Sequence, residues 1–271
     1  MKKLAQVLFL IIFGFLLSSP LVIAQEEFDF DKAYKDYVYT QQIYKNAHSE
    51  YLLAKSQYKG AKTLTSQTQA QQKTAIMLQA RDDVVITYLR ALRMRIAESS
   101  GVDEIVKQSL FSRIDNEIAW YETHKSQIPS AGTLSDLEVD SEVAADRFEN
   151  TYILAYETLS TAPMGKINNL YIKMDSLLQE IKTKIESIRQ KGDHDTSDTE
   201  RWVLETENKL SRSYNKQLTA QSNIDILQTG DFKGSAKTYY ERVVTNLQEA
   251  NQYLREANSY LQEILREIKT E

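Results

Sequence analysis

Cysteine is absent from all 271 residues of this sequence. The absence excludes thiol catalysis, cysteine-ligated zinc and iron–sulfur clusters, because each of these needs a thiolate sulfur. It also excludes disulfide bonds and a lipoprotein anchor, which is attached through a cysteine. We therefore expect core packing alone to stabilise the fold, as a chain of this size allows.

Glycine and proline are scarce, with eight and three residues in the whole chain. Between them the sequence is rich in Ala, Leu, Gln, Glu, Lys and Arg, which are good helix formers. Glycine is common just past the end of a helix, and proline interrupts a helix interior. Beyond residue 24 these residues therefore mark the expected helix ends: Gly60, Gly101, Pro129, Gly132, Pro163, Gly165, Gly192, Gly230 and Gly234.

The positions of these glycines and prolines predict seven helices. They are expected at about residues 28–59, 66–99, 103–127, 134–160, 164–190, 197–229 and 235–269. Ser66 and Ser197 each stand three residues before a Gln or Glu, which is the spacing of a capping box. Asp103 is suited to cap the third helix, and Pro163 suits the first turn of the fifth. The period-two alternation of strands is nowhere sustained, so the predicted fold class is all-α.

A seven-residue repeat runs through the first and the last of these helices. In the first helix the repeat comprises Phe30, Tyr37, Tyr44, Tyr51 and Tyr58, with Ala33, Thr40, Ala47, Ala54 and Ala61 three residues later. In the last helix it comprises Tyr240, Leu247, Leu254, Leu261 and Ile268, beside Ala236, Val243, Ala250, Ala257 and Ile264. Such repeats predict coiled-coil-like packing of nearly parallel axes. Because short connections make neighbouring helices antiparallel, we expect an elongated antiparallel bundle, with a possible sub-division near residues 128–134.

Long hydrophobic runs are missing after residue 24, where the longest aliphatic run is Val84–Ile86. A helix needs about 20 apolar residues to span a bilayer. We therefore exclude a pore-forming hairpin and expect no transmembrane segment in residues 25–271.

The N-terminus has a different character. Lys2 and Lys3 precede an apolar run from Leu4 to Leu17, and small residues stand just before Gln25. This pattern predicts a signal peptide over residues 1–24 and a helical bundle over residues 25–271. The alternative is an uncleaved segment that tethers the protein to the membrane.

A net positive charge is also missing. The chain has 33 basic and 38 acidic residues, and removal of residues 1–24 takes away two lysines, which leaves a net charge of −7. Nucleic-acid binding needs a basic face to contact phosphates. We therefore expect no nucleic-acid partner.

The first candidate functional feature is the line of tyrosines Tyr37, Tyr44, Tyr51 and Tyr58. Its seven-residue spacing favours a seam between helices, with each phenol reaching the edge for a hydrogen bond. The alternative is a ligand or partner face, such as a platform on which sugar rings stack.

The loop from Lys191 to Asp198 is the second candidate, because Asp193, His194 and Asp195 stand together in it. Its pattern does not match a calcium loop, and we interpret it as a solvated connection that caps the next helix. Neither His48 nor His124 has a second histidine at helical zinc-binding spacing, and no Gly-x-Ser-x-Gly elbow occurs. We therefore assign no catalytic residue, metal site or cofactor.

These observations predict an exported, non-enzymatic structural or interaction protein at the cell envelope or outside the cell. Its expected partner is a protein or an envelope component, or a second copy of the chain. The alternative function is a ligand-binding bundle that recognises a small molecule or a wall glycan through the tyrosine-lined face.

Overall fold

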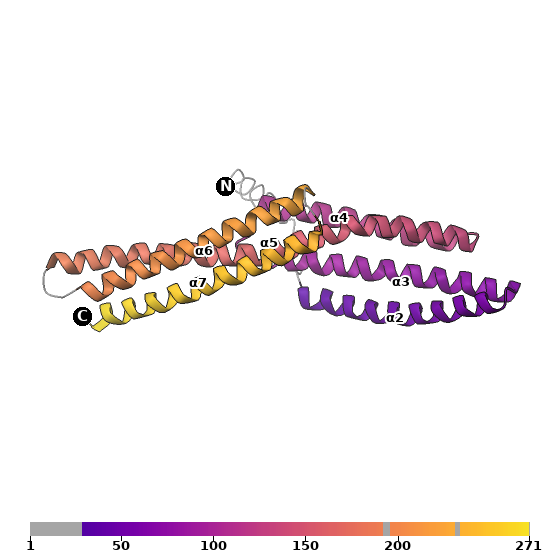
Figure 1. The fold of residues 1–271 in the computed structure, drawn as a ribbon, viewed down its shortest axis with the longest axis horizontal. Coiled ribbons are helices and arrows are strands. Elements are labelled where there is room, and N and C mark those ends of the chain that lie inside the picture. The colour runs from indigo at the N-terminus through magenta and orange to yellow at the C-terminus, as the bar shows by residue number, and fades with distance from the viewer. Residues whose placement is uncertain (1–28, 192–195, 231–233, 271) are drawn as a thin grey trace, which may run out of the picture.

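The structure, a computed structural model, describes residues 29–191, 196–230 and 234–270. Figure 1 shows an elongated molecule whose helices run along its long axis. The helices are α2 (Phe30–Gly60), α3 (Leu64–Ala97), α4 (Glu104–Gln127), α5 (Leu134–Lys191), α6 (Ser197–Thr229) and α7 (Ala236–Thr270), with a 3-10 turn at Ile128–Ser130. No strand occurs in the described part of the chain, so the predicted all-α helical bundle is confirmed. The predicted signal peptide lies outside the described residues.

The long helix α5 belongs to both ends of the molecule. At one end its first part packs with α3 and α4, and α2 lies against α3 (Figure 1). At the other end its second part packs with the α6–α7 hairpin. The chain therefore passes from one helical group to the other inside α5. The predicted sub-division near residues 128–134 stays a prediction.

The predicted break between residues 160 and 164 is wrong. Pro163 lies inside α5, which runs through it for 58 residues. Pro163 is exposed to solvent, and its missing N–H leaves the Leu159 carbonyl without its helical donor. Burial on both flanks, at Leu154 and Ala162 before it and Met174 after it, offsets this local cost.

The start of α3 also differs from the prediction. The N-cap is Thr63 rather than Ser66, whose backbone N–H donates to the Thr63 hydroxyl over 3.2 Å. The Ser66 hydroxyl in turn accepts from the Thr63 N–H over 3.1 Å, so the reciprocal box forms one turn earlier. Serine suits the third position of a helix as well as the N-cap position, because its hydroxyl both donates and accepts hydrogen bonds. Asp103 does cap α4, accepting from the Ile105 N–H over 2.8 Å.

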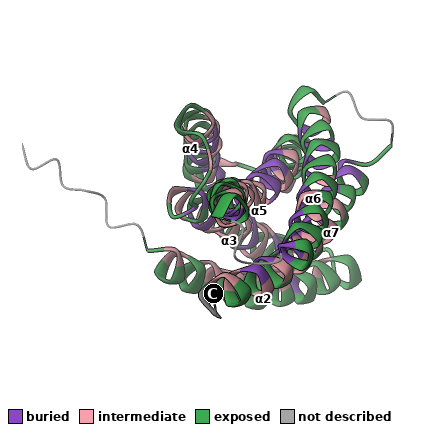
Figure 2. Ribbon diagram, turned by 90° about the vertical axis from the view of Figure 1, so that its left-hand side faces the viewer, coloured by how far each residue is buried: buried purple, intermediate pink, exposed green. Residues whose placement is uncertain are grey.

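Buried residues lie on the sides of the helices that face one another, as Figure 2 shows. In α7 the second set of residues of the predicted repeat is completely buried: Ala236, Val243, Ala250, Ala257 and Ile264. In α2 only Ala47 and Ala54 are buried, against α3. Both helices carry the seven-residue repeat, but α7 packs on α5 and α6, whereas α2 packs chiefly on α3.

The turn between α3 and α4 crosses α5 at very close range. Gly101 has a positive φ of 76° and stands against Gly165 of α5. A Cβ atom added to Gly165 would lie 2.8 Å from the Val102 nitrogen, so neither glycine has room for a side chain. This crossing fixes the position of the α3–α4 pair along α5, two residues beyond Pro163.

None of the helices in residues 29–191, 196–230 and 234–270 has the length and apolar character that crossing a membrane requires.

Candidate functional site: a tyrosine-lined groove

Three hollows follow one another along α2, α3 and α5, and Tyr121 of α4 also lines the middle one. The outermost has a volume of about 580 Å³, the middle one about 340 Å³ and the innermost about 310 Å³. Val84, Val85 and Phe148 line both the middle and the inner hollow. The three hollows lie in line between α2 and α5 over α3, and they are here named together the α2–α5 groove, with α3 as its floor.

The four tyrosines singled out in the sequence line this groove in order. Tyr51 and Tyr58 line the outer hollow, Tyr44 the middle one and Tyr37 the inner one. All four are half-buried, because the alanine line three residues away turns directly toward α3 and leaves the tyrosines on the flank. They are therefore neither a closed seam nor a fully exposed platform, and their role as a ligand or partner face stays a prediction.

Local contacts hold the tyrosine rings in place. The His48 ring lies between Tyr44 and Tyr51, with centroids 5.7 and 5.9 Å away. The Tyr51 hydroxyl accepts a hydrogen bond of 2.8 Å from Lys55 Nζ, and this bond raises the pKa of Lys55. Tyr37 packs on Tyr88 of the floor at 5.2 Å between centroids. The groove wall is thus ordered before anything binds to it.

The opposite wall is formed by aromatic residues of α5. Phe148, Tyr152 and Tyr156 follow one another at four-residue spacing on the side that faces α2. Tyr156 stacks on Tyr240 of α7 with 4.8 Å between centroids, so the start of α7 stands at the inner end of the groove. Burial raises the pKa of Tyr88 to about 12, so its phenol stays neutral at any physiological pH.

The charge of the groove differs between its two walls. At the outer end, Lys55 and Lys59 line the α2 side, whereas Glu138 and Glu142 line the α5 side. The middle hollow is lined almost entirely by apolar side chains, and Arg81, its only charged residue, donates to the Ser141 hydroxyl over 3.2 Å. The groove is therefore mainly apolar in its middle and inner hollows and polar at its outer end, where the two walls carry opposite charges.

A buried polar pair lies behind the groove floor. Asp82 of α3 and His124 of α4 are both buried, and 2.6 Å separates Asp82 Oδ2 from His124 Nδ1. The other ring nitrogen lies 3.0 Å from the Asp140 carbonyl oxygen. A carbonyl only accepts, so Nε2 carries a proton and both ring nitrogens are engaged. His124 thus has no nitrogen left for a substrate or a metal, and the pair joins three helices.

The same polar layer continues along α4 and α5. The Trp120 ring stacks on the His124 ring with 5.1 Å between centroids, and the Arg147 guanidinium lies over the same Trp120 ring, 5.4 Å from its centroid. Arg147 makes two hydrogen bonds with Glu117, of 3.0 and 2.5 Å. Thr151 also donates to Glu117, over 3.0 Å. These contacts set the register between α4 and α5.

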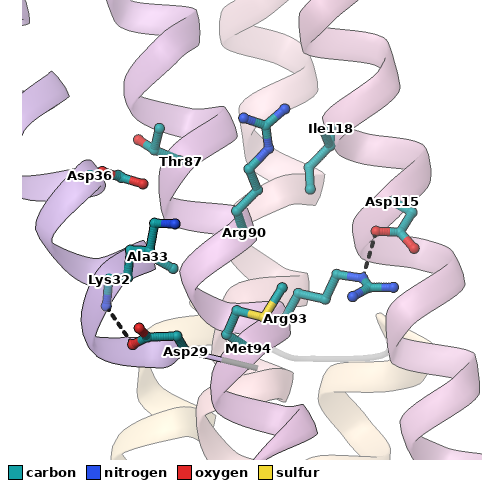
Figure 3. Close-up of a pocket in the computed structure, with 10 residues that line it drawn as sticks. All are labelled: Asp29, Lys32, Ala33, Asp36, Thr87, Arg90, Arg93, Met94, Asp115 and Ile118. Atoms are coloured by element: carbon teal, nitrogen blue, oxygen red, sulfur yellow. Dashed lines mark hydrogen bonds and ion pairs between the residues drawn. The ribbon is translucent and has the colours of Figure 1, made fainter. Parts of the chain in front are cut away.

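A second cleft lies on the other flank of α2, between α2, α3 and α4, and has a volume of about 480 Å³. Figure 3 shows that charged side chains of both signs line it. Arg93 Nε lies 2.9 Å from Asp115, and Arg90 reaches Glu122 at 2.6 Å. Because the two arginines are already paired with carboxylates, they are less available to bind a charged ligand.

Sequence reasoning identified the tyrosines but not the residues that face them. Phe148, Tyr152 and Tyr156 could have been found as a run of aromatics at four-residue spacing. Nothing in the sequence connects Asp82 with His124, which stand 42 residues apart. Asp193, His194 and Asp195 lie outside the described residues. Within the described ones, no group of three or more His, Asp or Glu residues is placed to hold a metal ion.

Replacement of Tyr51 tests how far the tyrosine line contributes to stability. Tyr51 packs beside Ala47, Met77 and Leu78, so Tyr51→Ala is expected to cost about 1–2 kcal/mol, less than the ~3–5 kcal/mol of a fully buried ring. Tyr51→Phe loses only an exposed hydrogen bond and should cost less than about 0.5 kcal/mol. Thermal melting followed by circular dichroism measures both.

The matched control is Tyr39→Ala on the same helix, since Tyr39 is 69% exposed. It should leave the melting temperature almost unchanged. An equal loss for Tyr39→Ala and Tyr51→Ala would contradict the packing role of Tyr51.

In comparisons with known proteins, no family model, curated protein or solved structure matched this chain.

Proposed function

We propose that this chain is an exported, non-enzymatic structural or interaction protein that acts at the cell envelope or outside the cell, and that its binding face is the α2–α5 groove. The observation that carries the proposal is the apolar, aromatic channel left open between α2 and α5. Such a channel exposes to water the kind of surface that most helices bury against a neighbour.

The chemistry of the groove favours binding over catalysis. Its middle and inner hollows are lined mainly by tyrosine, phenylalanine and aliphatic side chains, with Arg81 in the middle hollow and the other charged groups at the outer mouth. Tyrosine and phenylalanine provide large contact areas at a small cost in conformational entropy, which is why they are enriched at protein interfaces. The ordered rings favour a partner that presents a complementary apolar ridge.

A small molecule or a wall glycan is the second candidate, and one observation favours it. At the outer end, polar groups of Lys55, Glu138 and Ser141 stand beside the rings of Tyr51 and Tyr58, a combination that suits a sugar. The middle hollow does not suit a sugar, because sugar hydroxyl groups buried there would lack hydrogen-bond partners. A glycan would thus occupy the outer hollow alone.

Site-specific photo-crosslinking in the producing cells tests the proposal. A photoreactive phenylalanine analogue placed at Phe148, in the groove wall, is expected to form a discrete crosslinked protein product. The same analogue at Leu218 of α6 is the control, because the two side chains are 48% and 49% exposed. Equal crosslinking from both positions, or none from Phe148, would show that the groove is not the binding face.

A further inference from the structure

Arg81 is a cation whose hydrogen-bonding capacity is only partly used. Its Nη1 donates to the Ser141 hydroxyl over 3.2 Å, whereas its Nη2 is buried and has no hydrogen-bond partner in the described part of the chain. Its Nε lies 3.5 Å from Asp82 Oδ1, which is longer than a good hydrogen bond. The other oxygen of Asp82 is held by His124. A buried donor of a charged group is costly to leave unpaired, so Arg81 is suited to bind an anionic group.

The hollow that Arg81 lines is otherwise mainly apolar. Its other lining residues are Tyr44, Val84, Val85, Tyr121, Ala144, Ala145 and Phe148. Three of these residues also line the inner hollow, so the two hollows adjoin. In the inner hollow the hydroxyl of Thr151 already donates to Glu117 over 3.0 Å. A ligand that fills both hollows therefore needs a hydrocarbon body, and its polar end must lie at Arg81.

We infer that the middle and inner hollows together bind a long-chain carboxylate, such as a fatty acid, with its carboxylate at Arg81 and its alkyl chain extended toward Tyr156. The inference rests on the proposed function of the groove as a binding face and assigns a ligand to that face. The Arg81 side chain is 24% exposed, so a rotation of its long stem brings Nη2 from its buried position into the hollow. The guanidinium then donates a charge-assisted hydrogen bond to the carboxylate.

The shape of the two hollows suits a slender chain. Their volumes are about 340 and 310 Å³, and each is near the lower end of the range for small-molecule pockets. Along the floor, Tyr88 follows Arg81 by seven residues of α3, or about 10 Å. An extended alkyl chain covers this distance between the rings of Tyr37 and Tyr156. Each methylene group that it buries should raise the affinity about fourfold.

The distribution of charge favours one carboxylate over a polyanion. Arg81 is the one charged residue among those that line the middle and inner hollows. Glu138 and Glu142 line the outer hollow on either side of Ser141, which is the residue that binds Arg81. A second negative charge on the ligand would therefore meet no further cation in these two hollows and would be repelled at their outer end.

Isothermal titration calorimetry of the full chain with laurate tests the inference. We expect saturable binding of one laurate per chain. Lauramide, which has the same alkyl chain but no charge, should bind at least about tenfold more weakly, because it lacks the charge-assisted hydrogen bond. Hexanoate should also bind at least about tenfold more weakly than laurate, because its chain buries fewer methylene groups. Arg81→Gln should weaken laurate binding by at least about tenfold and change lauramide binding by no more than a few fold.

The matched control is Arg90→Gln on the same helix. This arginine lines the cleft on the other flank of α2, so its replacement should leave laurate binding unchanged. Val84→Trp places a large ring where the two hollows adjoin and should weaken the binding of laurate and lauramide alike. Circular dichroism of every variant checks that the fold is kept.

Equal affinities of the unchanged protein for laurate and lauramide would overturn the inference, and this comparison needs no variant. Laurate binding that survives Arg81→Gln or Val84→Trp at full strength would overturn it as well. If laurate does not bind while Phe148 still crosslinks to a protein, the carboxylate site is wrong and the proposed function stands.

Discussion

Gly101→Ala is expected to destabilise the folded protein by about 3–4 kcal/mol. The new Cβ would overlap the carbonyl oxygen of Gly165 and lie 2.8 Å from the Cβ of Asn169, so the turn must move off α5. Overpacking of this kind costs roughly 1–3 kcal/mol. The positive φ at Gly101 adds about 1–2 kcal/mol for a residue with a side chain. Urea unfolding followed by circular dichroism measures the loss.

Two other glycines separate these contributions. Gly230, which ends α6, has a φ of 73° but no atom within 4 Å of an added Cβ, so Gly230→Ala should cost only about 1 kcal/mol. Gly60 is the last residue of α2 and has neither constraint, so Gly60→Ala should be neutral or stabilise by up to about 1 kcal/mol. If Gly101→Ala cost no more than Gly230→Ala, the close crossing with Gly165 would not contribute to stability.

Asp82→Ala is expected to cost about 3 kcal/mol, because it removes one member of a fully buried pair. It leaves His124 Nδ1 without a partner in a layer closed to water. Asp82→Asn should cost less than about 1 kcal/mol, since the amide can donate to Nδ1 while Nε2–H still donates to the Asp140 carbonyl. Equal losses for the two variants would contradict this assignment of donors and acceptors.

The pH dependence of the same pair follows from the pKa of Asp82. Burial raises this pKa, and the hydrogen bonds and charges of His124 and Arg81 only partly oppose the effect. Above the ordinary aspartate pKa, about 3.9, the unfolded chain loses a proton that folded Asp82 still holds. In that window the folded state binds more protons, so rising pH lowers the free energy of unfolding.

Asn does not titrate, so the stability of Asp82→Asn relative to the unchanged protein should increase as pH rises from about 3.9. Urea unfolding of both proteins at several pH values between acid and neutral measures the difference. A difference that stays constant, or that moves the other way, would show that burial does not dominate the ionisation of Asp82.

Helix composition and spacing predicted most of the fold. The ends of α2, α3, α4, α6 and α7 lie within about two residues of the predicted ones, chiefly because glycine, proline and capping residues act through local backbone geometry. The sixth, α5, did not follow the same rule. The effect of Pro163 depends on whether the two flanks of the helix are packed, and that packing involves residues far away in sequence. Ser66 shows the same limit on a smaller scale, since its hydroxyl serves equally well one turn into the helix.

The candidate site was predictable only in part. The repeat of Tyr37, Tyr44, Tyr51 and Tyr58 is visible in the sequence, but a seven-residue period does not tell whether a neighbouring helix is present. In α7 the neighbours are within the same chain, whereas in α2 one side is left open. The pairing of Asp82 with His124 depends on how α3 and α4 align. No local pattern contains that information.

The continuous backbone of α5 has a mechanical consequence. The two helical groups at its ends are joined by this helix, which is about 87 Å long at 1.5 Å per residue. Tension applied between the ends is carried along its hydrogen-bond ladder. One hydrogen bond of this ladder is already missing, at the carbonyl of Leu159, because Pro163 has no N–H to donate. In the next turn, α5 is held by the close contact between Gly165 and Gly101. Under a pull the helix should first stretch at the proline, and the clamp should keep that opening from spreading to the other end.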